Sequence, residues 1–240
     1  MGNFNLGRVA QYARYHYTSQ FNKYLSFALF VFGIPVILGI LDRSIHNVEG
    51  VAMVVYFFGA MSIARYSMMP LRGRGTKIIE STLPVSIKER LSFMVVNCAV
   101  VYPLVALALT LLAVICVAPF QYGDVTDLLG AELKDIATQC HLYWPIYILV
   151  QIIASTSLLI NILARRSLVA ASAIGFAIIA ILLAILARIG VAFYIFYTEM
   201  GYVINNFTMP EPMVIAIYCS IPVVLYAICY IALRKRQIKW

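Results

Sequence analysis

The sequence predicts an all-α, polytopic membrane protein with six transmembrane helices, an N-terminal amphipathic elbow helix and a re-entrant segment before the last span. Of its 240 residues, 63% are hydrophobic and only 12% are charged, whereas soluble domains average about 45–50% apolar and about 25% charged residues. Six apolar stretches are each long enough to cross the hydrocarbon core, which takes about 20 residues. Lys and Arg gather in alternate loops, as in multi-pass membrane proteins. We therefore expect a single transmembrane domain over 1–240.

The positions of the six predicted spans and the charges of the loops between them predict the orientation of the chain. They are Tyr24–Leu41, Val51–Met69, Leu91–Phe120, Leu142–Leu163, Leu168–Ala187 and Met213–Leu233. One set of loops, together with both termini, holds most of the basic residues: Arg8, Arg14, Lys23, Arg65, Arg72, Arg74, Lys77, Lys88, Arg90, Arg165, Arg166, Arg234, Lys235, Arg236 and Lys239. Nearly all acidic residues belong to the other set. The basic side of a membrane protein is cytoplasmic, so both termini are expected there, including the basic tail 234–240.

The first 22 residues predict an amphipathic elbow helix. Apolar side chains recur every three to four residues at Leu6, Val9, Ala10, Ala13, Tyr17 and Phe21. The remaining positions are mostly polar, basic or tyrosine, Tyr12 among them. Such a helix suits the headgroup level of a membrane, where its basic residues meet anionic lipid. The alternative is an amphipathic arm that packs on the protein itself.

The cytoplasmic loop 70–90 carries an apolar surface that needs a partner. The loop is predicted to form a short helix followed by an extended segment that a proline terminates. This arrangement would expose four apolar side chains: Ile78, Ile79, Leu83 and Val85. Ser86 and Glu89 have the spacing of a capping box, which predicts a helix that starts in the cytoplasm and continues into the third span.

Two segments are expected on the outer side. The loop 121–141 carries apolar residues at helical spacing and is expected to lie along the membrane surface. The segment 188–211 is aromatic and apolar but too short to cross twice, which favours re-entrant half-helices. Arg188 opens this segment, and either snorkels to the outer surface or contacts a transported molecule.

The chain carries no recognisable catalytic or metal motif. It lacks P-loop, G-x-G-x-x-G and H-E-x-x-H patterns, its five cysteines form no C-x-x-C pair, and its three histidines fall on different segments. No catalytic residue and no metal site are predicted, the chain is not expected to be an enzyme, and a basic stripe for nucleic acid is missing. Polar residues within the spans are expected to form interhelical hydrogen bonds or to line a path: Asn97, Thr110, Gln151, Ser155, Thr156, Ser157, Asn161 and Ser172. Four prolines are expected to kink helices, where neighbouring helices satisfy the freed carbonyls: Pro35, Pro103, Pro145 and Pro222.

This layout resembles the permease subunit of type-2 ABC exporters. Residues 81–90, STLPVSIKER, are similar to the L-P-V-S-x-x-E/K element that follows the coupling helix of that family. The resemblance implies ATP-driven export of a hydrophobic or amphipathic substrate across the bacterial inner membrane. ATP and Mg²⁺ would then bind a separate cytoplasmic ATPase, and this chain would hold no cofactor.

The resemblance also implies where partners bind. The coupling contact to the ATPase falls on Lys77, Ile78, Ile79, Glu80 and Leu83. A second permease chain, most simply in a homodimer, is expected to meet the first span at the small residues Ala28, Gly33 and Gly39, although these residues equally suit packing within the chain. The alternative function is the substrate-binding membrane subunit of a vitamin importer, which also has about six spans.

Overall fold

The computed structural model describes residues 4–68, 85–120, 130, 133–134, 144–163, 177 and 211–237, and all regular elements within these ranges are helical. The prediction of an all-α fold is therefore confirmed for this part of the chain. The elements are α1 (Leu6–Ser19), α2 (Phe21–Asp42), α3 (Ile45–Met68), α5 (Ile87–Val96), a π-helical turn (Asn97–Val101), α6 (Tyr102–Val117), a 3₁₀ turn (Ala118–Phe120), α8 (Trp144–Leu163) and α10 (Glu211–Gln237).

Four stretches of the described chain are long and apolar enough to cross a membrane, namely Phe21–Asp42, Asn47–Met68, Ile87–Phe120 and Ile146–Leu163. They coincide with the first four predicted spans and are compatible with a multi-pass, membrane-embedded protein. The sixth predicted span overlaps α10. The fifth span lies outside the described residues except for Ala177, and the segment 188–211 lies outside them except for Glu211.

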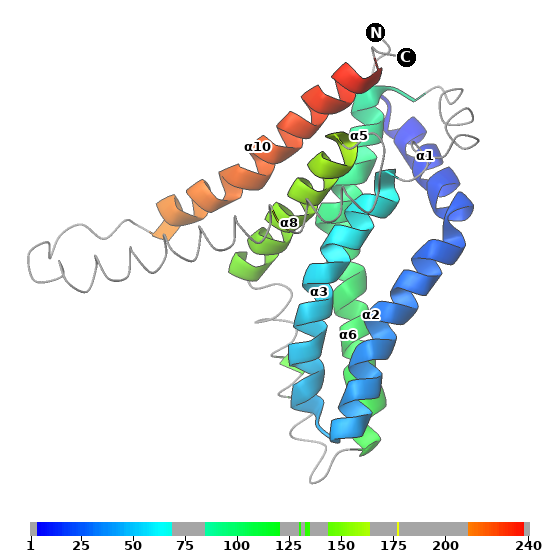
Figure 1. Cartoon of the computed structure of the whole chain (residues 1–240), viewed down its shortest axis with the longest axis vertical. Helices are drawn as coiled ribbons and strands as arrows, with labels where there is room; N and C mark the ends of the chain where they lie inside the picture. Colours follow the sequence, from blue (N-terminus) through cyan, green and yellow to red (C-terminus); the bar gives the residue numbers. More distant parts are fainter. Residues whose placement is uncertain are drawn as a thin grey trace, which may run out of the picture.

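The helices form a bundle around α3 and the stretch Ile87–Phe120 (Figure 1). This stretch joins α5, the π-helical turn, α6 and the 3₁₀ turn, and we call it the α5–α6 rod. Helix α2 packs against α3 and α6, α8 packs against α3, and α10 packs against α8. A large core cluster draws buried side chains from α1, α3, α5, α6, α8 and α10. A second cluster lies near the α2–α3 turn and contains Ile45, Val48, Val114 and Val117.

The two ends of the bundle differ in charge. Helix α1 begins and α10 ends at the same end of the molecule (Figure 1), and both contact α5. The last turn of α3 carries Arg65, the first turn of α5 carries Arg90, and Arg234 lies near the end of α10. Asp42 and Glu49 flank the α2–α3 turn at the opposite end, where Arg43 is the one basic residue of the turn. This distribution agrees with the loop charges, while orientation in a membrane stays a prediction.

Helix α1 exists where the sequence predicts one, and the expected apolar face is right in part, because Val9, Ala13 and Tyr17 pack against the core. Tyr12 and His16 are buried, whereas Leu6 is 74% exposed. The buried face packs on α5 through edge contacts between Tyr12 and Phe93, whose ring centroids are 5.3 Å apart. An aromatic body buries well whatever its polar tip, so leaving Tyr12 and His16 off the expected face rotates that face away from the observed one. Helix α1 therefore packs on α5, while its position at the headgroup level of a membrane stays a prediction.

Candidate functional site

The first turn of α5 is closed by the predicted capping box. The Ser86 hydroxyl accepts a hydrogen bond from the Glu89 N–H at 3.3 Å, and Glu89 Oε2 accepts one from the Ser86 N–H at 2.7 Å. Two backbone donors that a helix start leaves without a helical partner are thereby satisfied. The capping box is confirmed, and it fixes the direction in which the chain enters the long α5–α6 rod.

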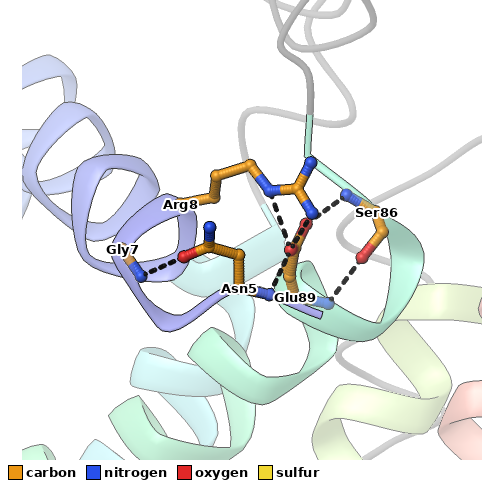
Figure 2. Close-up of polar contacts among 5 residues, drawn as sticks. All are labelled: Asn5, Gly7, Arg8, Ser86 and Glu89. Atoms are coloured by element: carbon orange, nitrogen blue, oxygen red, sulfur yellow. Dashed lines mark hydrogen bonds and ion pairs between the residues drawn. The ribbon is translucent and has the colours of Figure 1, made fainter. Parts of the chain in front are cut away.

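The same glutamate ties α1 to α5. Its other oxygen, Oε1, accepts hydrogen bonds from the Asn5 N–H at 2.9 Å and from Arg8 Nε at 3.0 Å, and it lies 2.9 Å from Arg8 Nη2 (Figure 2). Glu89 is fully buried, whereas the Arg8 side chain is one-third exposed. A buried carboxylate is tolerated only when donors and a countercharge surround it. We call Asn5, Arg8, Ser86 and Glu89 the elbow lock.

Two turns further along this rod, Asn97 joins three other helices. Its Oδ1 accepts from the Tyr17 hydroxyl of α1 at 2.7 Å. Its Nδ2 donates to the Tyr24 hydroxyl of α2 at 3.2 Å and to Ser67 Oγ of α3 at 2.7 Å. Asn97 is 1% exposed, and these bonds use its side-chain oxygen and both amide donors. The residue is therefore a fixed junction of four helices.

Asn97 also opens the π-helical turn, which has an identifiable cause. The Tyr102 N–H bonds to the Asn97 carbonyl five residues back, and Pro103 follows without an N–H. A donor at 103 would serve the Ala99 carbonyl in α register or the Cys98 carbonyl in π register. The proline therefore leaves both carbonyls without this helical partner.

Helix α8 supplies the missing donors. The Tyr147 hydroxyl donates to the Ala99 carbonyl at 2.8 Å, and Gln151 Nε2 donates to the Cys98 carbonyl at 3.4 Å. Gln151 Oε1 in turn accepts from the Tyr226 hydroxyl of α10 at 3.1 Å. The expectation that neighbours satisfy carbonyls freed by a proline is confirmed here. Freed carbonyls of the rod thus connect it to α8 and through α8 to α10.

The polar residues expected within the spans divide into two groups. Asn97 and Gln151 bond across helices as described, and Ser157 Oγ donates to the Met61 carbonyl of α3 at 3.2 Å. Three others bond to carbonyls of their own helix: Thr110, Ser155 and Asn161. All six are buried, as is Thr156. Ser172 lies outside the described residues.

Two titratable side chains of α1 are perturbed by their surroundings. Burial lowers the pKa of His16 to about 4, with repulsion from Lys23 as a smaller cause. Burial also raises the pKa of Tyr17 to about 12, with the nearby Cys98 thiol as a smaller cause. At neutral pH the imidazole is therefore neutral and the Tyr17 phenol keeps the proton that it donates to Asn97.

The residues predicted to contact partners are placed as follows. The predicted coupling residues Lys77, Ile78, Ile79, Glu80 and Leu83 lie outside the described residues. On α2, Ala28 is half-buried, and a Cβ added to Gly33 would meet no atom within 4 Å. A Cβ at Gly39 would lie 2.5 Å from Val48 Cγ2 and 2.9 Å from Val117 Cγ2. Gly39 therefore packs within the chain, while Gly33 faces away from the described helices.

The elbow lock and the Asn97 junction were not foreseen from the sequence. Arg8 and Glu89 belong to segments far apart in the chain, and no local pattern pairs them. Tyr17 and Tyr24 look like interfacial aromatic residues. One signal was available, because Pro103 inside an apolar run requires donors from a neighbouring helix, and α8 was the span richest in polar side chains.

The polar groups described here join helices to one another. No group of three or more His, Cys, Asp or Glu side chains that could hold a metal ion occurs among the residues that the structure describes. The elbow lock, the Asn97 junction and the α8 donors instead run from α1 along α5 to α10. Such a chain of packed, hydrogen-bonded elements is suited to passing a displacement between them. No protein-family model, curated protein or solved structure matches this chain.

Proposed function

We propose that this chain is the membrane permease subunit of an ATP-driven transporter of the type-2 ABC exporter kind, with hydrolysis in a separate cytoplasmic ATPase. The proposal rests on how the first turn of α5 is formed. The segment that resembles the family element, 81–90, ends in a capping box that opens a membrane-length rod, and the same carboxylate holds an amphipathic N-terminal helix.

The polar network supports a mechanical role for this rod. In the proposal, the ATPase pushes on the loop 70–90, and the displacement enters α5 at its first turn. Glu89 transfers it to α1, and Asn97 transfers it to α2 and α3. The donors of α8 carry it onward to α10. One input thus moves several helices together, as alternating exposure of a path requires.

The charge distribution supports placing the ATPase at the end of the bundle where α1 begins. Arg65, Arg90 and Arg234 lie in helix turns at that end, and basic residues favour the cytoplasmic side. The transported molecule is proposed to be hydrophobic or amphipathic, because the spans present few charges and many aliphatic and aromatic side chains.

A second permease chain is proposed to meet α2, by analogy with the family. Only 17% of the apolar window of α2 is buried, and Gly33 lies on its open side. A small residue on an open helix face allows close approach of another helix. We place the contact on the Gly33 side of α2, because Gly39 packs against Val48 and Val117.

The test targets the loop that would bind the ATPase. The tagged chain is purified in mild detergent from its own cells, and the copurified Mg²⁺-dependent ATPase activity is measured. Replacing both Ile78→Asp and Ile79→Asp should abolish copurification, because two carboxylates cannot enter an apolar socket. The matched control is the pair Asn47→Asp and Gly50→Asp, at exposed positions of the opposite end of the bundle.

Four outcomes are informative. Loss of the ATPase in the first pair with retention in the control supports the proposal. An ATPase that binds equally in both pairs removes the coupling assignment from loop 70–90, and absence of any ATPase from the unaltered complex overturns the proposal. Recovery of a third, distinct membrane subunit together with the ATPase favours the importer alternative.

A further inference from the structure

The C-terminal half of α1 is docked through an enclosed histidine. His16 is 0% exposed and is surrounded by aromatic rings of α1, α2 and α5. Its ring centroid lies 4.8 Å from that of Phe93, 5.9 Å from that of Tyr24, 6.1 Å from that of Tyr12 and 6.2 Å from that of Tyr17. The elbow lock holds the first turn of α1, and further along the helix the aromatic cage and the hydrogen bond from Tyr17 to Asn97 attach it.

The cage gives the imidazole one polar partner. His16 Nε2 lies 3.1 Å from the Tyr24 hydroxyl, and that hydroxyl already accepts from Asn97 Nδ2. The Tyr24 oxygen offers both lone pairs and an O–H, so the contact with Nε2 is made whichever of the two groups donates. Nδ1 is buried and has no hydrogen-bond partner among the described residues. The site accommodates a neutral ring with one nitrogen satisfied.

A second proton would have no compensation there. Protonation makes both ring nitrogens donors, of which Nδ1 has no partner among the described residues, and it adds a charge removed from water. The titratable groups that face the ring are the phenols of Tyr12 and Tyr17 on α1 and of Tyr24 on α2, and the charged group that acts on it is Lys23, which repels a cation. From α5, Phe93 offers only a tilted ring, and the carboxylate of Glu89 bonds instead to Asn5, Arg8 and Ser86.

The connection between α1 and α2 allows the helix to leave. The two helices are separated only at Gln20, whose backbone, at φ −113° and ψ 15°, interrupts the helical run. Gln20 Oε1 accepts from Lys23 Nζ at 2.6 Å. A rotation at this residue that carried α1 away from α5 would also break the hydrogen bond from Tyr17 to Asn97.

We propose that His16 is an acid-sensitive latch, which holds α1 on α5 while neutral and releases the helix when protonated. The direction follows from the two protonation equilibria. The docked imidazole has a pKa of about 4, and the released one returns toward 6.5. The contribution of His16 to the free energy of docking is therefore fully present above pH 6.5 and is lost progressively as pH falls from 6.5 to 4. The ratio of docked to released helix drops about tenfold between pH 7.5 and pH 5.5.

The test measures release directly in the full chain. In a background without the native cysteines, Ala13→Cys places a thiol on the docked face of α1, and Gln11→Cys places one on its exposed face. Maleimide labelling of position 13 is divided by that of position 11, which removes the pH dependence of the thiol reaction itself. The ratio should rise about tenfold from pH 7.5 to pH 5.5.

Two variants separate titration from loss of packing. His16→Asn keeps a polar side chain but does not titrate in this range, so its ratio should not change with pH, whatever its level. Glu89→Gln weakens the elbow lock and should raise the ratio at every pH while keeping the pH response. With His46→Asn and His141→Asn, the single remaining histidine should show an NMR titration well below pH 6.5. A flat ratio in the His16 protein, an unchanged pH response in His16→Asn, or a titration near 6.5 would overturn the latch.

Discussion

Helices α2 and α8 are both apolar and of membrane length, yet they occupy opposite environments. Within their apolar windows, 17% of α2 is buried and 67% of α8 is buried. Helix α2 lies on the outside of the bundle, and α8 lies between α3 and α10 (Figure 1). In a soluble protein the more apolar helix would be the inner one. Inside lipid this rule fails, because hydrocarbon accepts Leu and Phe as well as a protein core does.

The polar side chains distinguish the two helices. From its middle to its last turn, α8 carries several buried polar residues: Gln151, Ser155, Thr156, Ser157 and Asn161. The polar residues of α2 stand in its first two turns and at its end, and Ser26 bonds only to the Asn22 carbonyl of its own helix. A polar group in hydrocarbon must find a partner in the protein. The span with the most polar residues is therefore the interior one.

The largest test of this contrast truncates a leucine on each helix. Leu158 of α8 is 0% exposed and Leu29 of α2 is 60% exposed. Leu158→Ala should lower the free energy of unfolding by about 2–5 kcal/mol, because it leaves a cavity between packed helices. Leu29→Ala should change it by less than about 0.5 kcal/mol. Titration of the detergent-solubilised chain with SDS measures both, and equal losses would show that α2 is as enclosed as α8.

Much of the fold could be predicted from the sequence. The first four spans follow from stretches of apolar residues, since length and composition alone decide whether a helix can cross a membrane. The start of α5 follows from the spacing of Ser86 and Glu89, which is a local signal. The buried face of α1 could not be predicted in the same way. Tyr12 and His16 are ambiguous residues, and only the position of Phe93 on another helix decides where they point.

The polar junctions were harder to predict from the sequence, because they depend on contacts between residues that are distant in the chain. That Pro103 frees carbonyls is readable locally, whereas the choice of Tyr147 and Gln151 as donors depends on the register between two helices. The Arg8–Glu89 pair requires α1 to fold back onto α5. The sequence thus indicates which groups need partners, and the packing of the helices selects those partners.

A smaller effect is expected from two glycines of α2, which test its two faces. Gly39→Ala should cost about 1–3 kcal/mol, because the new methyl would overlap Val48 and Val117. Gly33→Ala meets no atom within 4 Å and should raise the stability of the isolated chain by up to about 1 kcal/mol through helix propensity. Thermal unfolding of the two variants measures the difference. If Gly33→Ala is the more damaging change, the outer face of α2 is occupied.

The smallest effect concerns single hydroxyl groups on the inner and outer helices. Tyr147→Phe removes the donor to the Ala99 carbonyl and should cost about 1 kcal/mol, since interhelical hydrogen bonds in membranes average about 0.6 and reach about 1.7 kcal/mol. Ser26→Ala on α2 should cost less than about 0.5 kcal/mol, because the carbonyl it contacts keeps its place in the helix. The comparison distinguishes the stabilisation from a hydrogen bond between two helices from that of a hydrogen bond within one helix.

Pro103→Ala makes the cause of that difference measurable. It restores a backbone N–H that can serve the carbonyls of Cys98 or Ala99, so the Tyr147 hydroxyl becomes less necessary. In this background Tyr147→Phe should cost clearly less than it does beside the proline, which gives a positive coupling in a double-mutant cycle. Additive losses would mean that the hydroxyl stabilises α8 independently of the carbonyls freed by the proline. The inner position of α8 would then depend on apolar packing alone, and its polar residues would mark that position without determining it.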